Sequence, residues 1–257
     1  MRFAQIVSIV IASVAALGVA PGAAPSARAD DSKLGREDVM IQPRALERGK
    51  NKLCCGYPLS ATDGFALHFY HLALERDYDE PAEIGFKNPD EIDLYTPEGY
   101  YLGSYPEKFA WSLRMEGTGL LTDGRVLNYT GPCRFGYGTC FEEADTSINP
   151  YGRGAQHRPL IPFKSAAVDP RVVPIGEPLY VPEFDGMVLP DGSIHDGCVR
   201  GDDTGGNIKG REMDFFVVTY ANFRFLLEEM ANISYITPQV ESPRCEYMRD
   251  YVRPSKW

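Results

Sequence analysis

Two scarcities in this sequence exclude broad classes of protein. Basic residues are outnumbered, with 26 Lys and Arg against 36 Asp and Glu in 257 residues, and the formal net charge is -10 at pH 7. Proteins that bind nucleic acid neutralise phosphates with clustered Lys and Arg, so we expect no nucleic-acid partner. The apolar run at residues 6–20 is shorter than the roughly 20 residues that cross a bilayer as a helix, so a membrane-spanning protein is not expected either.

The motifs of several enzyme classes are absent as well. The sequence has no GxSxG nucleophile elbow, no HExxH zinc motif, no Rossmann glycine fingerprint and no GxxxxGK[ST] phosphate loop. Its four histidines show no arrangement typical of a catalytic triad, and no Cys-x-x-Cys pair occurs. His195, Asp196 and Cys198 lie too close together in the sequence for a tetrahedral zinc site. We therefore predict neither a metal nor a cofactor.

Residues 1–29 have the pattern of a signal peptide. Arg2 precedes the apolar run, and residues 27–29 (Ala-Arg-Ala) form the small-x-small pattern at which signal peptidase cleaves. No cysteine follows the run directly, so a lipid anchor is not indicated. The alternative, an uncleaved anchor, is less consistent with the length of the run. We predict an exported protein of the periplasm or the extracellular space, without a stable membrane anchor after cleavage.

All six cysteines follow residue 29, and an even number in an oxidising compartment predicts up to three disulfides. Cys133 and Cys140 bracket a short segment and are the easiest pair to close. Cys54 and Cys55 are adjacent, and a bond between neighbours distorts the peptide that joins them. We therefore expect each of these two to reach a distant cysteine, and the sequence does not fix the pairing.

The rest of the chain predicts a mainly β protein. From residue 100 onward, short segments typical of strands alternate with Gly and Pro, and residues 122–125 (Thr-Asp-Gly-Arg) indicate a hairpin turn. An amphipathic helix is expected late in the chain, at residues 222–230. This pattern favours a small barrel over an α/β sheet. The predicted strands are residues 100–103, 111–121, 125–129, 178–181 and 213–220.

We divide the chain on this basis into a signal peptide at 1–29, an N-terminal extension of uncertain fold at 30–110, a barrel at 111–236 and a C-terminal tail at 237–257. Within the extension, residues 65–74 (FALHFYHLAL) suit either a strand or one face of a helix. Residues 77–97 contain many carboxylates and three prolines, so we expect them to form a loop.

Three segments of the barrel region contain the candidate site residues. They read V-D-P-R-V-V-P-I-G, D-T-G-G-N-I-K-G and M-D-F-F, around Asp169, Asp203 and Asp214 in turn. The first two segments have an ordinary explanation as turns, because Asp and Gly are common turn residues. Gly205 and Gly206 would permit close approach of the backbone to a ligand or to a crossing strand.

Asp214 is the strongest candidate. In a strand over residues 211–220 side chains alternate between faces, so Asp214 shares its face with large apolar groups. Burial there raises the pKa of a carboxyl group, and an acid that stays protonated near neutral pH can act as a general acid. The alternative is a structural ion pair with Lys209 or Arg211.

The order and spacing of the three segments resemble the 3D domain, which is named for its three aspartates. This domain occurs in the membrane-bound lytic transglycosylase A type and in related bacterial cell-wall proteins. Residues 115–129, which begin MEGTG, are similar to the strand pair that opens its barrel. The resemblance covers residues 115–129 and 167–219. It implies a six-stranded double-psi β-barrel that acts on peptidoglycan glycan strands.

The resemblance also implies roles for individual residues. The aspartate of the last segment is the catalytic acid in these transglycosylases, which implies this role for Asp214, with Asp203 as a second catalytic residue in the same cleft. The aspartate of the first segment completes the acidic cluster. Substrate binding is implied for Asp169, Thr204, Gly205, Gly206 and Lys209.

A lytic transglycosylase breaks the β-1,4 bond between N-acetylmuramic acid and N-acetylglucosamine. Protonated Asp214 would give its proton to the glycosidic oxygen, and an oxocarbenium-like centre would form. The C6 hydroxyl of the muramic sugar would then attack and give a 1,6-anhydro product. Repulsion from Asp203 would raise the pKa of Asp214. We expect the enzyme to be a monomer.

Two other functions stay open at this point. One is a non-catalytic, expansin-like barrel that binds polysaccharide or peptidoglycan, because a fold alone does not fix a function. The other is a glycoside hydrolase with Asp214 as the acid and Asp203 or Asp169 as the base, for which the two carboxyl groups should stand about 6.5–9.5 Å apart. We prefer the transglycosylase, because a binding module has no evident need for a carboxylate on the apolar face of a strand.

Overall fold

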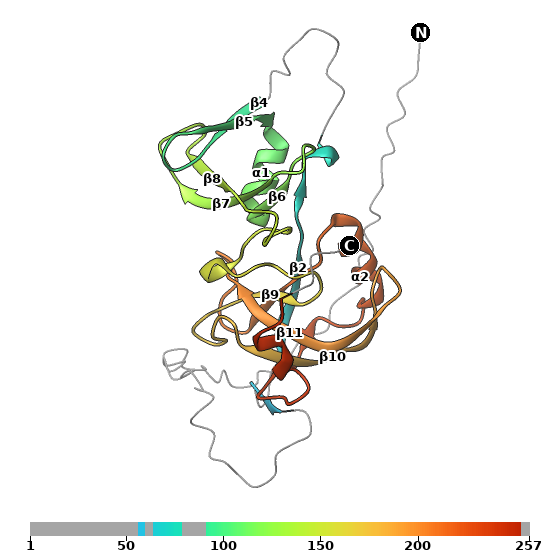
Figure 1. Ribbon diagram of the computed structural model, residues 1–257. Helices are drawn as coiled ribbons and strands as arrows, with labels where there is room; N and C mark the ends of the chain where they lie inside the picture. The colour runs from blue at the N-terminus through green and yellow to red at the C-terminus, as the bar shows by residue number, and fades with distance from the viewer. Residues whose placement is uncertain (1–55, 60–63, 79–90, 253–257) are drawn as a thin grey trace, which may run out of the picture. The chain divides into compact units, whose positions relative to one another are not determined.

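The computed structural model describes residues 56–59, 64–78 and 91–252 (Figure 1). The predicted signal peptide, Cys54 and Cys55 lie outside the described residues. Most regular structure in the described part is β, so the prediction of a mainly β protein is confirmed. None of the helices described is long and apolar enough to cross a membrane.

An eight-stranded sheet carries the three aspartate segments. Its strands are β1 (Tyr57–Pro58), β2 (Phe65–Tyr70), β9 (Ser165–Val168), β10 (Pro178–Val188), β11 (Ile194–Asp203), β12 (Glu212–Phe216), β13 (Tyr235–Ile236) and β14 (Gln239–Val240). Their order is β1-β14-β10-β11-β9-β12-β2-β13. The pairs β9 with β11 and β2 with β12 are parallel, and the other pairs are antiparallel.

A six-stranded sheet is built from the segments between β2 and β9. Its strands are β3 (Ala73–Leu74), β4 (Glu91–Tyr95), β5 (Tyr101–Pro106), β6 (Thr118–Leu120), β7 (Val126–Pro132) and β8 (Thr139–Glu143). Their order is β3-β6-β7-β8-β4-β5. Short 3-10 helices accompany the two sheets at η1 (Glu75–Asp77), η2 (Ala155–His157) and η3 (Glu246–Arg249).

The ambiguous segment 65–74 forms two strands, and the first of them lies beside the strand of Asp214. β2 pairs in parallel with β12 along its length, from Ala66 opposite Glu212 to Tyr70 opposite Phe216. The sheet that carries Asp214 therefore includes a strand from residues that we assigned to the N-terminal extension. β12 pairs with β9 on one side and with β2 on the other, so both of its edges are hydrogen-bonded.

The prediction of a strand over residues 111–121 is wrong for its first half. Helix α1 (Glu107–Glu116) occupies this stretch, and Phe109, Ala110 and Leu113 are its fully buried side chains. Their spacing is that of one helical face. Gly117 ends the helix in the left-handed conformation, at φ 79°, and its N–H donates to the carbonyl of Leu113.

The hairpin predicted around residues 122–125 is confirmed, but it lies in a different sheet from the one expected. β6 and β7 pair antiparallel, with Leu120 opposite Val126. Both belong to the six-stranded sheet and not to the sheet of Asp214. The expectation that residues 115–129 open the barrel of the site is therefore wrong as to the sheet, since β7 pairs onward with β8.

The loop expected over residues 77–97 contains a strand. β4 alternates between exposed Glu91 and Asp93 and inward-facing Ile92 and Leu94, the period of two that a half-buried strand requires. Leu94 is fully buried. The neighbouring prolines suggested a loop, although they flank this alternation and do not interrupt it.

The predicted strand at residues 213–220 is shorter than expected, and the late helix is confirmed. β12 ends at Phe216, Val218 has a left-handed φ of 74°, and helix α2 (Tyr220–Glu229) follows. The side chain of Thr219 caps this helix, because its Oγ1 accepts a hydrogen bond from the N–H of Asn222 at 3.1 Å.

Two disulfides lie within the described residues. Cys133 and Cys140 are bonded, as predicted, and Cys198 is bonded to Cys245. These bonds use all four of the cysteines after Cys55. Because Cys54 and Cys55 lie outside the described residues, the expectation of distant partners for those two stays a prediction.

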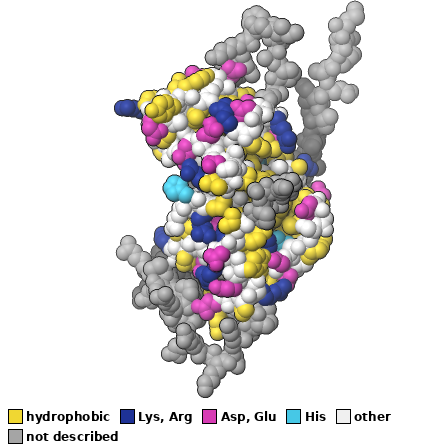
Figure 2. Space-filling view, viewed as in Figure 1, with side chains coloured by type: hydrophobic (Ala, Val, Ile, Leu, Met, Phe, Trp, Pro, Cys, Tyr) yellow, Lys and Arg dark blue, Asp and Glu magenta, His cyan; other side chains and the backbone are white. Residues whose placement is uncertain are grey.

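Surface charges of both signs are mixed. On the face shown in Figure 2, Lys and Arg side chains lie among Asp and Glu side chains, and the described residues form no continuous basic area there. Ion pairs among the described residues include Arg125 with Asp123 at 2.7 Å and Arg244 with Asp185 at 2.7 Å.

Candidate active site

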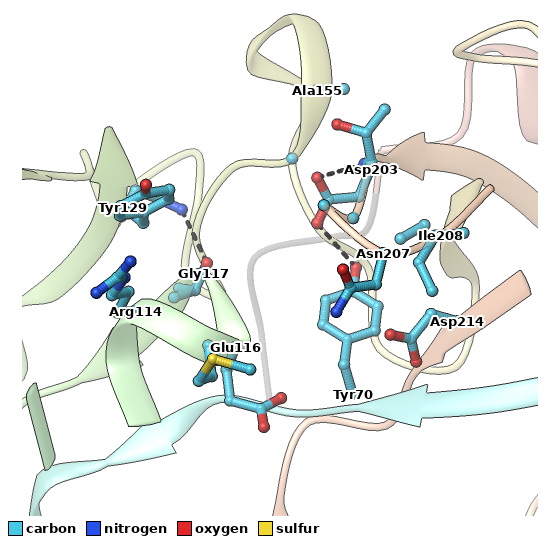
Figure 3. A pocket seen from close by; sticks show the side chains of 18 of the residues that line it. Tyr70, Arg114, Glu116, Gly117, Tyr129, Ala155, Asp203, Asn207, Ile208 and Asp214 are labelled. Carbon is cyan, nitrogen blue, oxygen red and sulfur yellow. Dashed lines mark hydrogen bonds between the residues drawn. The ribbon is translucent and has the colours of Figure 1, made fainter. Parts of the chain in front are cut away.

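A pocket of about 690 Å³ is lined by residues of both sheets and contains two of the three aspartates. Asp203 and Asp214 come from β11 and β12. Figure 3 shows them on one side of the pocket, Arg114 and Tyr129 on the other, and Glu116 between the two sides in this view. The pocket thus presents carboxylates near one wall and an arginine at the opposite wall.

Asp214 is a half-buried carboxylate with no counter-ion within residues 56–59, 64–78 and 91–252. Its Oδ1 is buried and has no hydrogen-bond partner. Burial, followed by the negative charges of Glu116 and Asp203, raises its pKa to about 7. Among the described residues no ion pair joins it to Lys209 or Arg211, so the ordinary explanation of this carboxylate is not supported. A large fraction of Asp214 is therefore protonated near neutral pH.

The strand position of Asp214 gives it an apolar setting and access to the pocket. Met213 and Phe215 point to the opposite face and are fully buried. On its own face Phe216 is fully buried against the ring of Tyr70, with centroids 5.1 Å apart. The residue opposite Asp214 on β9 is Ala167, which also lines the pocket. A methyl side chain at that position leaves the carboxyl group open to the cavity.

Asp203 lies at the end of β11 and has a partner on each oxygen. The N–H of Thr204 donates to Oδ1 at 2.8 Å, and the hydroxyl of Tyr70 donates to Oδ2 at 3.2 Å. Burial raises the pKa of Asp203 to about 6, although both hydrogen bonds oppose the rise. The same burial and the nearby carboxylates raise the pKa of Tyr70, so its hydroxyl stays a donor. Sequence reasoning gave no role to Tyr70.

The glycine-rich segment after Asp203 meets the pocket only in part. Thr204, Gly205 and Gly206 line it, as does Ile208. A Cβ at Gly205 would lie 2.5 Å from Cγ1 of Ile208, whereas a Cβ at Gly206 would meet nothing within 4 Å. Ile208 therefore leaves no room for a side chain at position 205, whereas the space beside Gly206 is open. Lys209 is exposed and does not line the pocket.

Asp169, the first of the three aspartates, lies outside the pocket lining. Its side chain is 2% exposed and accepts hydrogen bonds from Arg171 and from the N–H of Gly210. These bonds, that of the Arg171 side chain above all, hold the pKa of Asp169 well below its usual range. The structure therefore brings Asp203 and Asp214 together in one pocket and places Asp169 in a supporting turn.

Asp202 is a buried carboxylate that sequence reasoning missed. It is fully buried, and its oxygens accept hydrogen bonds from Arg158 at 2.8 Å, Arg200 at 2.6 Å and Ser165 at 2.6 Å. Arg200 is itself 2% exposed and also donates to the carbonyl of Met248. A carboxylate with this many donors is structural, and it fixes the end of β11 beside Asp203.

Glu116, Arg114 and Tyr129 are pocket residues that sequence reasoning also missed. They belong to α1 and β7, and the N–H of Tyr129 donates to the carbonyl of Gly117 at 2.8 Å (Figure 3). The only sequence signal was a carboxylate inside the MEGTG segment, which was interpreted there as part of a strand. Because the packing of α1 and the pairing of β7 bring these residues to the pocket, their position could not be predicted from local spacing.

The chemistry that the pocket offers is proton transfer at a carboxyl group. A protonated Asp214 can donate to a bound oxygen and, once ionised, can accept a proton back. Among the described residues, no group of three or more His, Cys, Asp or Glu side chains is arranged to hold a metal ion.

A comparison with protein-family models assigns part of this chain to a class. Residues 164–224 match the family model of the 3D domain. The matched stretch contains Asp169, Asp203 and Asp214, so the chain carries a 3D domain and the recognition made from the sequence is confirmed. It leaves out β2, α1 and β7, which supply Tyr70, Glu116 and Tyr129 to the pocket.

Several solved structures are similar to the chain at low identity. MltA of Escherichia coli with bound chitohexaose is 15% identical, with 70% of this chain and 72% of that chain covered and a TM-score of 0.43. The lytic transglycosylase LtgG of Burkholderia pseudomallei is 20% identical, with 70% and 71% covered and a TM-score of 0.36. A membrane-bound lytic murein transglycosylase of Agrobacterium tumefaciens is 14% identical, with 72% and 71% covered and a TM-score of 0.35. No curated protein matches the chain in sequence.

Proposed function

We propose that the protein is an exported lytic transglycosylase that cleaves peptidoglycan, with Asp214 as both general acid and general base. The observation that carries this proposal is a carboxyl group with a pKa of about 7 and no counter-ion, facing an open pocket inside a 3D domain. A six-stranded double-psi barrel is part of the same proposal. The parallel and antiparallel pairs of the eight-stranded sheet are compatible with it.

The reaction begins with a proton transfer. Protonated Asp214 gives its proton to the oxygen between N-acetylmuramic acid and N-acetylglucosamine, the bond from that oxygen to the muramic C1 breaks, and positive charge develops at C1. The C6 hydroxyl of the same sugar attacks C1 and loses its proton to Asp214. The carboxyl group ends as it began, and the products are a 1,6-anhydromuramic end and a free N-acetylglucosamine hydroxyl.

The surroundings of Asp214 favour this route over a hydrolase with two aspartates. A hydrolase needs a second carboxylate that activates water. Both oxygens of Asp203 already accept hydrogen bonds, from Thr204 and Tyr70, and Asp169 does not line the pocket. Because the transglycosylase takes its nucleophile from the substrate, it needs only one carboxyl group, and the buried Oδ1 of Asp214 has no hydrogen-bond partner among the described residues.

The test is mass spectrometry of purified peptidoglycan after digestion with the protein and with Asp214→Asn. We expect 1,6-anhydro-muropeptides from the native protein and a loss of at least about 100-fold in the variant, the scale of a general acid–base contribution. Asp145→Asn is the matched control, because Asp145 is an exposed carboxylate that does not line the pocket.

The other functions correspond to other outcomes of this experiment. Reducing ends that depend on Asp214 would show a hydrolase. No soluble product from the native protein, together with retention on sedimented peptidoglycan, would show a binding barrel and overturn the enzymatic proposal.

A further inference from the structure

Glu116 is the last residue of α1, and its carboxyl group lies in the same pocket as that of Asp214 (Figure 3). Its side chain is 23% exposed. The helix and the strand β12 belong to different parts of the sequence, 98 residues apart by residue number, and only the fold brings the two carboxyl groups together. Two carboxyl groups at one cavity raise the question of which one carries the charge.

The backbone of His71 fixes the position of Glu116. The N–H of His71 donates to Oε2 of Glu116 at 3.0 Å. The ring of His71 contributes less, because its Nε2 is 3.8 Å from Oε1 and its Nδ1 bonds the carbonyl of Leu72 at 2.9 Å. His71 directly follows β2, the strand that pairs with β12. β2 therefore positions Asp214, through its pairing with β12, and the residue that follows β2 positions Glu116.

Few other titratable or charged groups lie around Asp214. Tyr70 and His68 come from β2, with His68 directly opposite Asp214 in register, and Asp203 comes from β11. β9 presents the uncharged Ala167. Arg114 and Arg153 line the same pocket, and Arg153 is paired with Glu142.

Of these groups, Glu116 and Asp203 carry the negative charge that acts on Asp214, and Glu116 has the larger effect. Asp203 has a pKa of about 6, so part of its own charge is absent near neutral pH. The hydrogen bonds from Thr204 and Tyr70 stabilise the negative charge that remains on Asp203. The carboxyl group of Glu116 is held in place at the C-terminal end of α1 by the backbone N–H of His71.

We propose that Glu116 is a positioning residue of the active site, whose fixed negative charge holds Asp214 in its protonated form until substrate binds. This inference rests on the proposed function for its consequence in catalysis, but the interaction itself can be measured without a reaction. Ionising Asp214 beside Glu116 would put two like charges into a partly desolvated cavity, which costs free energy.

The first measurement is an NMR titration of the Asp214 carboxyl carbon in the native protein and in Glu116→Gln. Gln keeps an oxygen that accepts the bond from the N–H of His71, so the helix end is retained while the charge is removed. We expect the midpoint to fall by about one pH unit in the variant. Glu116→Asp restores the charge and should bring the midpoint back toward the native value.

Glu107→Gln is the matched control. Glu107 starts the same helix, about 14 Å from Glu116 at 1.5 Å per residue, and its replacement removes the same charge. We expect no change in the midpoint of Asp214. A midpoint that stays at the native value in Glu116→Gln, or that falls equally in Glu107→Gln, would overturn the inference.

The second measurement is the pH profile of cleavage. In Glu116→Gln the alkaline limb should move to lower pH by about one unit, which is about tenfold less activity at pH 8 relative to pH 5. An equal loss at every pH would indicate a structural role and would overturn the inference. If the native protein releases no product at any pH, the proposed function fails, and the titration still decides the role of Glu116.

Discussion

The Oδ2 atom of Asp169 accepts a hydrogen bond from the backbone N–H of Gly210 at 2.7 Å. This bond joins the turn after β9 to the end of the segment that lines the pocket with Thr204 and Gly206. Gly210 has a left-handed φ of 61° and leads into β12. The first aspartate of the 3D domain thus holds the chain that leads into β12, the strand of Asp214, and does not itself line the pocket.

Replacing Asp169 with Asn should therefore cost stability. The variant loses the charged acceptor of a nearly buried bond, and we expect the free energy of unfolding to fall by about 1–3 kcal/mol at pH 7. The pKa of Asp169 is lower in the folded protein than in the unfolded chain. Its contribution is therefore present above pH 4 and is lost as the pH falls further.

Urea unfolding of the native protein and Asp169→Asn at several pH values measures this effect. The difference between the two should shrink from pH 7 toward pH 3. A difference that is constant with pH would contradict the assigned role. The alkaline limb of the cleavage profile should be the same in both, because Asp169 does not contribute to the raised pKa of Asp214.

Asp214→Asn should make the fold more stable at alkaline pH. The pKa of Asp214 is raised from 3.8 to about 7 on folding, so the folded protein favours the protonated form. The native carboxyl group costs no stability below pH 4, and its cost grows as the pH rises through 7. The uncharged variant avoids this cost.

The measurement is the melting temperature of both proteins at pH 3.5 and pH 8. We expect nearly equal values at pH 3.5 and a melting temperature higher on the order of 10 °C in the variant at pH 8. Asp145→Asn serves as the control and should give no such gain. A variant less stable than the native protein at pH 8 would show that the carboxylate has a partner.

The two described disulfides should differ in their effect on stability. Cys198 and Cys245 are 47 residues apart in sequence, and Cys133 and Cys140 are 7 apart. On the chain-entropy model the longer loop contributes about 4 kcal/mol and the shorter about 2.5 kcal/mol. Replacing both cysteines of each pair with Ser, followed by urea unfolding, should therefore destabilise the protein more when Cys198 and Cys245 are removed. The reverse order would contradict this expectation.

Arg114 should contribute to the binding of acidic glycans. It lines the pocket opposite Asp203 and Asp214, and among the described residues no carboxylate pairs with it. A peptide-free peptidoglycan strand carries a free lactyl carboxylate on each muramic sugar, and an arginine is well suited to bind it. In the Asp214→Asn background, Arg114→Gln should weaken binding of such strands about tenfold.

Calorimetry with peptide-free strands and with a chitin oligosaccharide of equal length distinguishes recognition of the carboxylate from recognition of the sugar rings. The chitin oligosaccharide has no carboxylate, so Arg114→Gln should leave its affinity nearly unchanged. Arg134→Gln is the control, because Arg134 stacks on Phe135 and does not line the pocket. Equal weakening for both glycans would refute a role in charge recognition.

The parts of the site that lie within one local pattern could be predicted from the sequence. Alternation along β12 predicted that Asp214 shares a face with large apolar groups, and Phe216 and Tyr70 provide them. The late helix followed from helical spacing, and the hairpin at residues 122–125 from its turn residues. These features depend on residues that are close together in the chain.

The parts that depend on strand pairing could not be predicted. Tyr70 reaches Asp203 only because β2 lies beside β12, and a sequence does not state which strands are neighbours. The position of Glu116 in the pocket could not be predicted for a related reason. The sequence predicted a strand where α1 lies, and residues 115–129 were expected in the sheet of Asp214. The low pKa of Asp169 depends first on the side chain of Arg171, two residues away, and also on a backbone N–H 41 residues away, which local spacing does not reveal.

The parallel pairing of β2 with β12 also has a kinetic consequence. The two strands are separated by about 140 residues of chain, so this contact raises the contact order of the protein and its formation is entropically costly. Asp214 obtains its neighbours on β2 only when this long-range contact has formed. Residues 164–224 alone would leave one edge of β12 open to pairing with other chains, and such a fragment should aggregate instead of forming the pocket.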